Sequence, residues 1–182
     1  MTIRTFGGKT PILGARAYVD ATALILGDVV LGDDASLWPM AVARGDVQAI
    51  RIGARTNIQD GSVLHVTQDN RFNPGGHALV IGDDVTVGHG VILHACTVED
   101  RVLVGMGSTV LDGALIRSRV MIGAGSLVPP NKVLESGHLY LGSPVKRVRP
   151  LTEKELEYLE FSAGHYVELK DRHLQFTARE DG

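Results

Sequence analysis

The sequence predicts an all-β fold, a parallel β-helix with a C-terminal α-helix packed along it. Aliphatic residues recur at every sixth position through much of the chain, a period that neither an α-helix nor a pleated strand has. Small or β-branched residues often stand two positions before them. The chain is 44% hydrophobic but only 5% aromatic. Three such six-residue segments make one triangular coil, whose narrow interior admits aliphatic side chains but few rings.

The repeat predicts which residues point into the coil. The longest series is Ile92, Val98, Val104, Val110, Ile116, Ile122, Val128 and Leu134. An earlier block with the same spacing is Ile52, Ile58 and Leu64. The small or β-branched residues two positions before the later members are Ser108, Ala114, Val120 and Ser126. We therefore assign residues 1–150 to the β-helix.

The repeat is interrupted once. The segment 66–78 is polar, and its Asn73-Pro74-Gly75-Gly76 run is a strong turn signal. The aliphatic period resumes at Leu79. We expect this segment to be a loop that protrudes from the solenoid.

A helix is predicted after Pro150. Thr152 and Glu155 fit a capping box, with Thr152 as the N-cap. The apolar positions that follow with helical spacing are Leu156, Leu159, Ala163, Tyr166, Val167 and Leu174. A helix over 152–174 would be about 35 Å long, similar to roughly seven coils that each rise about 4.8 Å. Residues 151–182 are therefore expected to lie along the solenoid as part of the same structural unit.

Composition excludes several classes of function. The net charge of −3 is made of mixed signs, which favours neither nucleic acid nor an anionic membrane as a partner. No apolar stretch approaches the length of a membrane span. The first ten residues lack a signal-peptide pattern, and the single Cys96 suits a reducing compartment. We expect a cytoplasmic protein in which Cys96 is a small buried residue.

Two histidines occupy equivalent positions in the repeat. His65 follows Leu64 and His94 follows Leu93, and the two histidines are 29 residues apart. One coil of three six-residue segments accounts for 18 of these, and the remaining 11 approximate the loop at 66–78. The two side chains should therefore stack about 4.8 Å apart along the axis. Two imidazoles in that arrangement can bind one metal ion.

His89 is the third candidate ligand. It precedes His94 by five residues, which in extended chain corresponds to about 16 Å. A neighbouring subunit is therefore the more plausible source of this ligand, as in a ring of three chains with a site at each interface. Three neutral imidazoles and an open position are typical of catalytic zinc. Each histidine alone would be read as a surface residue, but the shared register favours a metal site.

Other polar residues precede His65 in the repeat. Gln59 has an amide that can both accept and donate a hydrogen bond, which suits a group that orients a nucleophile. Arg44 can pair with Asp46 or Asp60 across a subunit contact. The alternative for this pair is a solvated ion pair on a solenoid face.

Several segments together resemble the γ-class carbonic anhydrase family of left-handed β-helix trimers. They are Arg44-Gly45-Asp46, residues 57–65 with Asn57-Ile58-Gln59-Asp60, residues 87–96 with both His89 and His94, residues 104–108 and residues 140–146. They fall across most of residues 20–150, and the register of the three histidines is the specific part of the match.

The resemblance implies a fold and a reaction. It implies a left-handed coil, and reversible hydration of CO₂ to bicarbonate by a metal-bound hydroxide at trimer interfaces. It also assigns His65 and His94 of one chain and His89 of its neighbour to zinc, or to iron or cobalt. The implied further catalytic residues are Asn57, Gln59, Arg44, Asp46 and Asp60.

The chain departs from the family pattern at a few positions. Val47 stands where well-studied members carry a glutamate, and the acidic loop after the first histidine is missing, as in a bacterial subgroup. Phe161 and Gly164 stand where Tyr and Asn are expected. Two alternatives therefore stay open. One is a hexapeptide-repeat acyltransferase in which a histidine acts as a base toward acyl-coenzyme A, and the other is a metal-binding trimer with weak or no activity.

Overall fold

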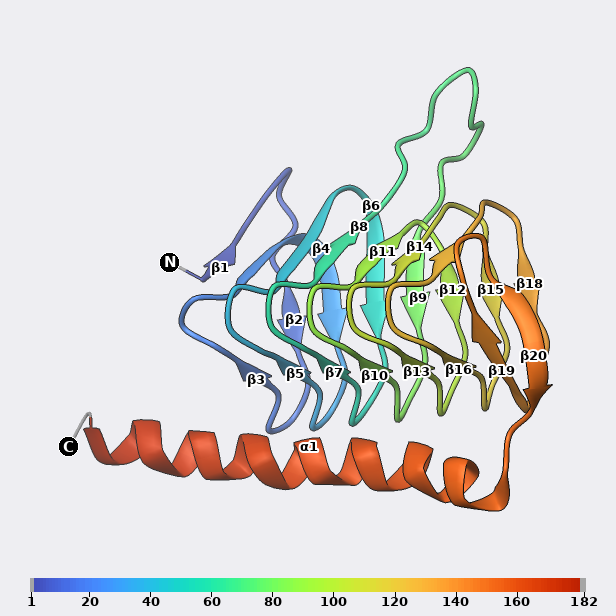
Figure 1. Ribbon diagram of the computed structural model, residues 1–182. Helices are drawn as coiled ribbons and strands as arrows, with labels where there is room; N and C mark the ends of the chain where they lie inside the picture. The colour runs from blue at the N-terminus through green and yellow to red at the C-terminus, as the bar shows by residue number, and fades with distance from the viewer. Residues whose placement is uncertain (1, 181–182) are drawn as a thin grey trace.

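The chain forms a parallel β-solenoid with three faces and one long helix beside it (Figure 1). The computed structural model describes residues 2–180. A 12-stranded sheet covers two faces of the solenoid, and an 8-stranded sheet covers the third. The first sheet is continuous because β4 (Leu24–Leu31) and β6 (Val42–Ile52) are long strands that extend over two faces. The predicted fold class is confirmed.

The remaining strands are short, as the six-residue period requires. In the 12-stranded sheet they are β1 (Ile3–Arg4), β2 (Ile12–Leu13), β8 (Val63–His65), β9 (Leu79–Ile81), β11 (Ile92–His94), β12 (Thr97–Val98), β14 (Thr109–Val110), β15 (Leu115–Ile116), β17 (Leu127–Val128) and β18 (Val133–Leu134). In the 8-stranded sheet they are β3 (Tyr18–Val19), β5 (Ser36–Leu37), β7 (Asn57–Ile58), β10 (Thr86–Val87), β13 (Leu103–Val104), β16 (Met121–Ile122), β19 (His138–Leu141) and β20 (Lys146–Pro150).

The core is a column of mostly aliphatic side chains that point inward from the strands and corners of the coils. Most of the predicted inward residues are buried, but Ile92 is 42% exposed and the prediction for it is wrong. Leu93 points inward instead, fully buried, and pairs in register with Leu64 and Val110. The reason is a corner between Leu93 and Val98 that is one residue shorter than the others. Ala95 turns this corner with a φ of 49°.

The segment 66–78 projects from the solenoid between β8 and β9 (Figure 1). Its neck is closed by a bridge between Thr67 and His77. The Gln48 side chain also donates a hydrogen bond to the Gly75 carbonyl at 3.1 Å. Because the loop leaves the coil and returns to it, the residues on either side keep their stacking.

The helix α1 (Glu153–Glu180) runs back along the solenoid (Figure 1). The capping box is present, since the Thr152 amide donates to the Glu155 carboxylate at 2.8 Å and the Glu155 amide donates to the Thr152 hydroxyl at 3.3 Å. The predicted end at Leu174 is too early, because the helix continues to Glu180. No helix within residues 2–180 is long and apolar enough to cross a bilayer.

A charged residue lies in the seam between helix and solenoid. Lys170 is fully buried, and its ammonium lies 2.8 Å from Asp34 and in contact with Asp171. The pKa of Asp34 is lowered to about 2, first by Arg16 and, against the effect of burial, also by Lys170. The helical pattern of apolar residues does not identify Lys170 as a buried residue. Asp34, which pairs with its charge, is distant in the sequence and comes close only in the folded structure.

An aromatic cluster fixes the far end of the helix. Trp38 is 5% exposed, and its ring lies 5.4 Å from Tyr18, 5.5 Å from Tyr166 and 5.1 Å from His173 between centroids. Its indole N–H donates to the Ser36 hydroxyl at 3.0 Å. Trp38 therefore packs between the first coils and α1 within one chain.

Candidate metal centre

His65 and His94 lie side by side on adjacent strands. They end β8 and β11, which pair in parallel with the two histidines as direct partners. Nδ1 of His65 is 3.1 Å from Nε2 of His94, and the ring centroids are 5.1 Å apart. The side chains are 19% and 32% exposed. One nitrogen of each ring therefore faces the other at a solvent-accessible site.

The outer nitrogen of each ring meets a carboxylate. Nε2 of His65 lies 3.2 Å from Asp46, and Nδ1 of His94 lies 2.6 Å from Asp112. An ionised carboxylate can only accept hydrogen bonds, so each outer nitrogen carries a proton. When both rings are neutral, the two inner nitrogens face each other as bare lone pairs. A cation between them would relieve that repulsion, and a carboxylate on the outer nitrogen is the usual support of a metal-binding histidine. The donor set fits a metal ion.

Burial favours the neutral form of His65. Burial lowers the pKa of His65, and the nearby Arg44 guanidinium lowers it further, against the opposing effect of Asp46. Burial raises the pKa of Asp46, but the hydrogen bond from Arg44 at 2.5 Å and the one from His65 hold it below its ordinary value. Burial also raises the pKa of Asp112, while Thr67 and His94 outweigh that effect and lower it. Neutral imidazole is the form that binds metals.

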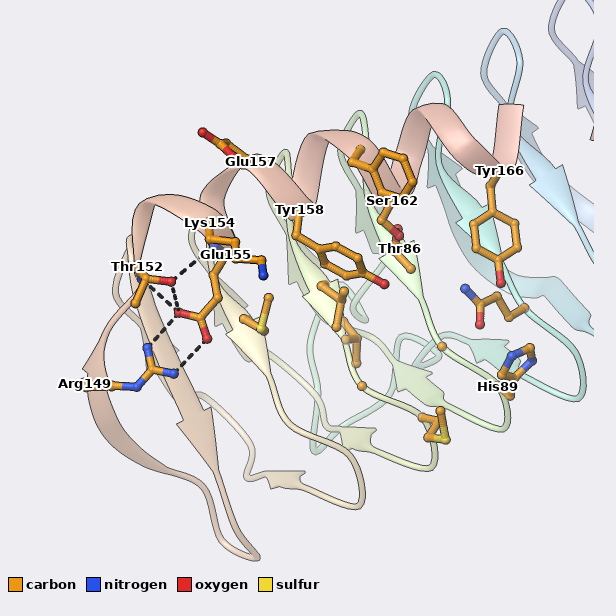
Figure 2. A pocket seen from close by; sticks show the side chains of 18 residues that line it. Thr86, His89, Arg149, Thr152, Lys154, Glu155, Glu157, Tyr158, Ser162 and Tyr166 are labelled. Atoms are coloured by element: carbon orange, nitrogen blue, oxygen red, sulfur yellow. Dashed lines mark hydrogen bonds and ion pairs between the residues drawn. The ribbon is translucent and has the colours of Figure 1, made fainter. Parts of the chain in front are cut away.

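His89 occupies a different place. Its side chain is 51% exposed, and its Nδ1 lies 2.9 Å from Asp60. It lines a groove of about 1080 Å³ between α1 and the 8-stranded sheet, opposite the helix residues Tyr158 and Tyr166 (Figure 2). Within residues 2–180, no three His, Cys, Asp or Glu side chains are grouped so as to hold a metal ion. One chain thus brings together two of the three candidate ligands.

A chain of hydrogen bonds holds Gln59 in the same groove. Gln59 is 5% exposed, and its amide N–H donates to Asn57 at 3.0 Å. The buried Asn57 amide donates to the Thr86 hydroxyl at 3.1 Å, which in turn lies 2.9 Å from the Ser162 hydroxyl of α1. This chain fixes the orientation of the Gln59 amide and leaves its oxygen free of these bonds.

The remaining sequence candidates divide between the two places. Arg44 pairs with Asp46 beside His65, whereas Asp60 pairs with His89, which lines the groove. Of the positions that depart from the family pattern, Phe161 lines the groove and stacks on the neighbouring His165, with centroids 5.8 Å apart.

Two residues at the histidine pair were not identified from the sequence. Asp112 contacts His94, and Thr67 donates a hydrogen bond to the other oxygen of Asp112. Asp112 follows His94 by 18 residues, the length of one coil. That spacing was the available signal, but a corner aspartate is common in such repeats and the spacing alone does not single it out.

Comparison with known proteins identifies carbonic anhydrases among the relatives. The chain is 58% identical to Escherichia coli protein YrdA over 172 residues, which cover 94% of each chain. It is 46% identical to a carbonic anhydrase of Geobacillus kaustophilus over 91% of this chain and 87% of that protein. It is also 41% identical to the mitochondrial gamma carbonic anhydrase 2 of Arabidopsis thaliana, covering 98% of this chain and 64% of the plant protein.

The solved structures contain similar solenoids. A hexapeptide transferase family protein from Anaplasma phagocytophilum superposes with a TM-score of 0.86 at 40% identity, over 93% of this chain and 96% of that one. No protein-family model matches the chain.

Proposed function

The chain belongs to the γ-class carbonic anhydrase family and has a carbonic anhydrase-like function; from that premise we propose that it hydrates CO₂ reversibly at zinc centres shared between the subunits of a homotrimer. The observation that carries the proposal is that two imidazole nitrogens face each other 3.1 Å apart, while the other nitrogen of each ring contacts a carboxylate. A pair held in this way can supply two of the three ligands of a metal centre.

The proposed ligands are His65 and His94 of one subunit and His89 of the next. Support comes from the position of His89, which is half exposed and held by Asp60 on a different side of the solenoid. Three neutral imidazoles favour zinc, although iron and cobalt accept the same donors. A bound zinc ion at such a site supplies Lewis acidity, which makes water a competent nucleophile near neutral pH.

The protein residues hold the ligands and orient the reactants. Asp46, itself held by Arg44, keeps the His65 ring in one orientation. Asp60 does the same for His89. Gln59 is the residue we assign to the reacting atoms, because its N–H is engaged by Asn57 and its free oxygen can accept a hydrogen bond from the attacking water. That bond would direct a water lone pair at the CO₂ carbon.

Acyl transfer is the competing function, because a similar solved structure is called a transferase. The exposed His89 with Asp60 has the composition of a histidine base and its orienting carboxylate. That interpretation gives no role to His65 and His94. The carbonic anhydrase interpretation gives a role to all three histidines, and we therefore favour it. We also propose a cytoplasmic location, which suits the single buried Cys96.

Stopped-flow CO₂ hydration with a pH indicator tests the proposal. Protein loaded with zinc, and anaerobically with iron, is compared with His94→Ala prepared in the same way. We expect metal-dependent hydration that is lost in the variant, and no turnover of acetyl-coenzyme A. Equal rates for the two proteins, with metal confirmed in the wild type, would rule out the anhydrase assignment.

A further inference from the structure

Asp112 links the histidine pair to the neck of the protruding loop. It follows β14 at a corner of the coil, with a side chain that is 33% exposed. One of its carboxylate oxygens lies 2.6 Å from Nδ1 of His94. The other accepts a hydrogen bond from the hydroxyl of Thr67, the second residue after His65. Both oxygens of this carboxylate are therefore engaged around the metal-binding pair.

The contact decides which nitrogen of His94 is available. A carboxylate oxygen has no proton to give, so Nδ1 of His94 carries the proton and Nε2 is bare. Nε2 is the nitrogen that faces His65 at 3.1 Å. In free histidine the proton prefers Nε2, and that tautomer would direct an N–H toward the place of the metal. The contact with Asp112 thus stabilises the Nδ1-protonated tautomer, which free histidine disfavours, and holds the ring in one orientation.

Thr67 decides the orientation of Asp112. Its single hydroxyl proton goes to the carboxylate, which opposes rotation of that group away from His94. Thr67 also exchanges backbone hydrogen bonds with His77, at 3.0 and 2.9 Å, where segment 66–78 leaves and re-enters the solenoid. The neck of the loop and the His94 ring are consequently parts of one hydrogen-bonded unit.

We propose that Asp112 is a positioning residue for the metal ligand His94, and that Thr67 at the loop neck holds Asp112 in place. This inference rests on the proposed metal centre. Asp112 acts through the imidazole and does not contact substrate. Removing its charge should therefore weaken metal binding more than it affects folding, because the rest of the corner is held by backbone contacts such as the Asn131 amide on the Asp112 carbonyl at 2.9 Å.

The first test is a chelator competition for zinc on the assembled protein. Asp112→Asn keeps the side-chain volume, and we expect it to weaken zinc binding about 10- to 100-fold. Thr67→Val should weaken binding by a smaller factor. The matched control is Asp69→Asn, because this loop carboxylate accepts a hydrogen bond from the Gly75 amide at 2.8 Å and contacts neither histidine of the pair. It should retain wild-type affinity. Wild-type affinity in Asp112→Asn, with thermal unfolding unchanged, would overturn the proposal.

The second test reads the tautomer directly, by ¹⁵N NMR of histidine-labelled, metal-free protein. We expect the His94 proton on Nδ1 in the wild type, assigned by its absence in His94→Gln, and a shift toward Nε2 in Asp112→Asn. A wild-type proton on Nε2 would contradict the inference. The two proposals fail separately. Zinc binding without hydration would refute the anhydrase function alone, and a protein that binds no zinc would still report the tautomer.

Discussion

At the residue scale, the three candidate ligands share one structural feature. Each imidazole has one nitrogen on a carboxylate, which leaves the other nitrogen for a second partner. The pairs are His65 with Asp46, His94 with Asp112 and His89 with Asp60. A carboxylate of this kind sets the ring's tautomer and orientation before any metal arrives, and this preorganisation is what a metal centre requires.

Replacing Gln59 should affect the reaction without affecting metal binding. Gln59→Ala removes the amide oxygen that we assign to the attacking water, and the hydration rate should fall about 10- to 100-fold. Zinc content should stay at the wild-type level, because Gln59 contacts Asn57 rather than a histidine. Stopped-flow rates together with elemental analysis measure both quantities.

The control for this variant is Gln68→Ala, in the exposed part of segment 66–78. It should leave the rate unchanged. If Gln59→Ala retained the full rate, the assignment of Gln59 to the reacting atoms would be wrong.

The sequence made the histidines easier to identify than their supports. His65 and His94 were recognisable because each directly follows a leucine, and because the loop length explained their separation. Asp112 and Lys170 were not recognisable in the same way. Their roles depend on Thr67 and Asp34, which are 45 and 136 positions distant and come close only when the coils and helix stack.

At the scale of elements, the six-residue period predicted most of the solenoid and failed at a corner. The period assumes equal corners, but the one between Leu93 and Val98 is a residue shorter. The shortening leaves Ile92 exposed. It occurs directly beside His94, where Ala95 adopts a left-handed φ of 49°. An average over repeats cannot detect a local change of this kind.

Two glycines of one corner should respond differently to the same substitution. A Cβ at Gly105 would lie 2.5 Å from the Ala124 amide nitrogen of the next coil, whereas a Cβ at Gly107 would meet nothing within 4 Å. We expect Gly105→Ala to cost about 3 kcal/mol or more of unfolding free energy, through overpacking against backbone. Gly107→Ala has only the left-handed φ of +67° to accommodate, at about 1 to 2 kcal/mol.

Urea unfolding of both variants at one protein concentration measures this difference. A fixed concentration is needed because the stability of the proposed trimer would depend on it. Equal losses of unfolding free energy, or a larger loss for Gly107→Ala, would mean that close contact with the next coil does not determine which side chains this corner tolerates.

At the scale of the whole molecule, one chain does not bring the three candidate ligands together. His65 and His94 meet on one side of the solenoid, while His89 and Gln59 line the groove under α1. The repeat predicted the fold of one chain because each coil stacks only on the coils next to it. The only sign of the proposed assembly in the sequence is the spacing of His89 and His94, which is difficult to reconcile with one shared site within a single chain.

A mixed-trimer experiment tests the central claim, that each metal centre is built from two subunits. His89→Ala and His94→Ala are each expected to lose tight zinc as homotrimers. When the two variants are refolded together in equal amounts, about three quarters of the trimers are mixed. Every mixed trimer then contains one interface with all three histidines. The measurement is the zinc retained by the mixture after gel filtration against a chelator.

We predict that the mixture retains about one quarter of the zinc of the wild-type trimer, because each mixed trimer restores one site in three. A mixture that retains no more zinc than either variant alone would contradict a centre shared between subunits.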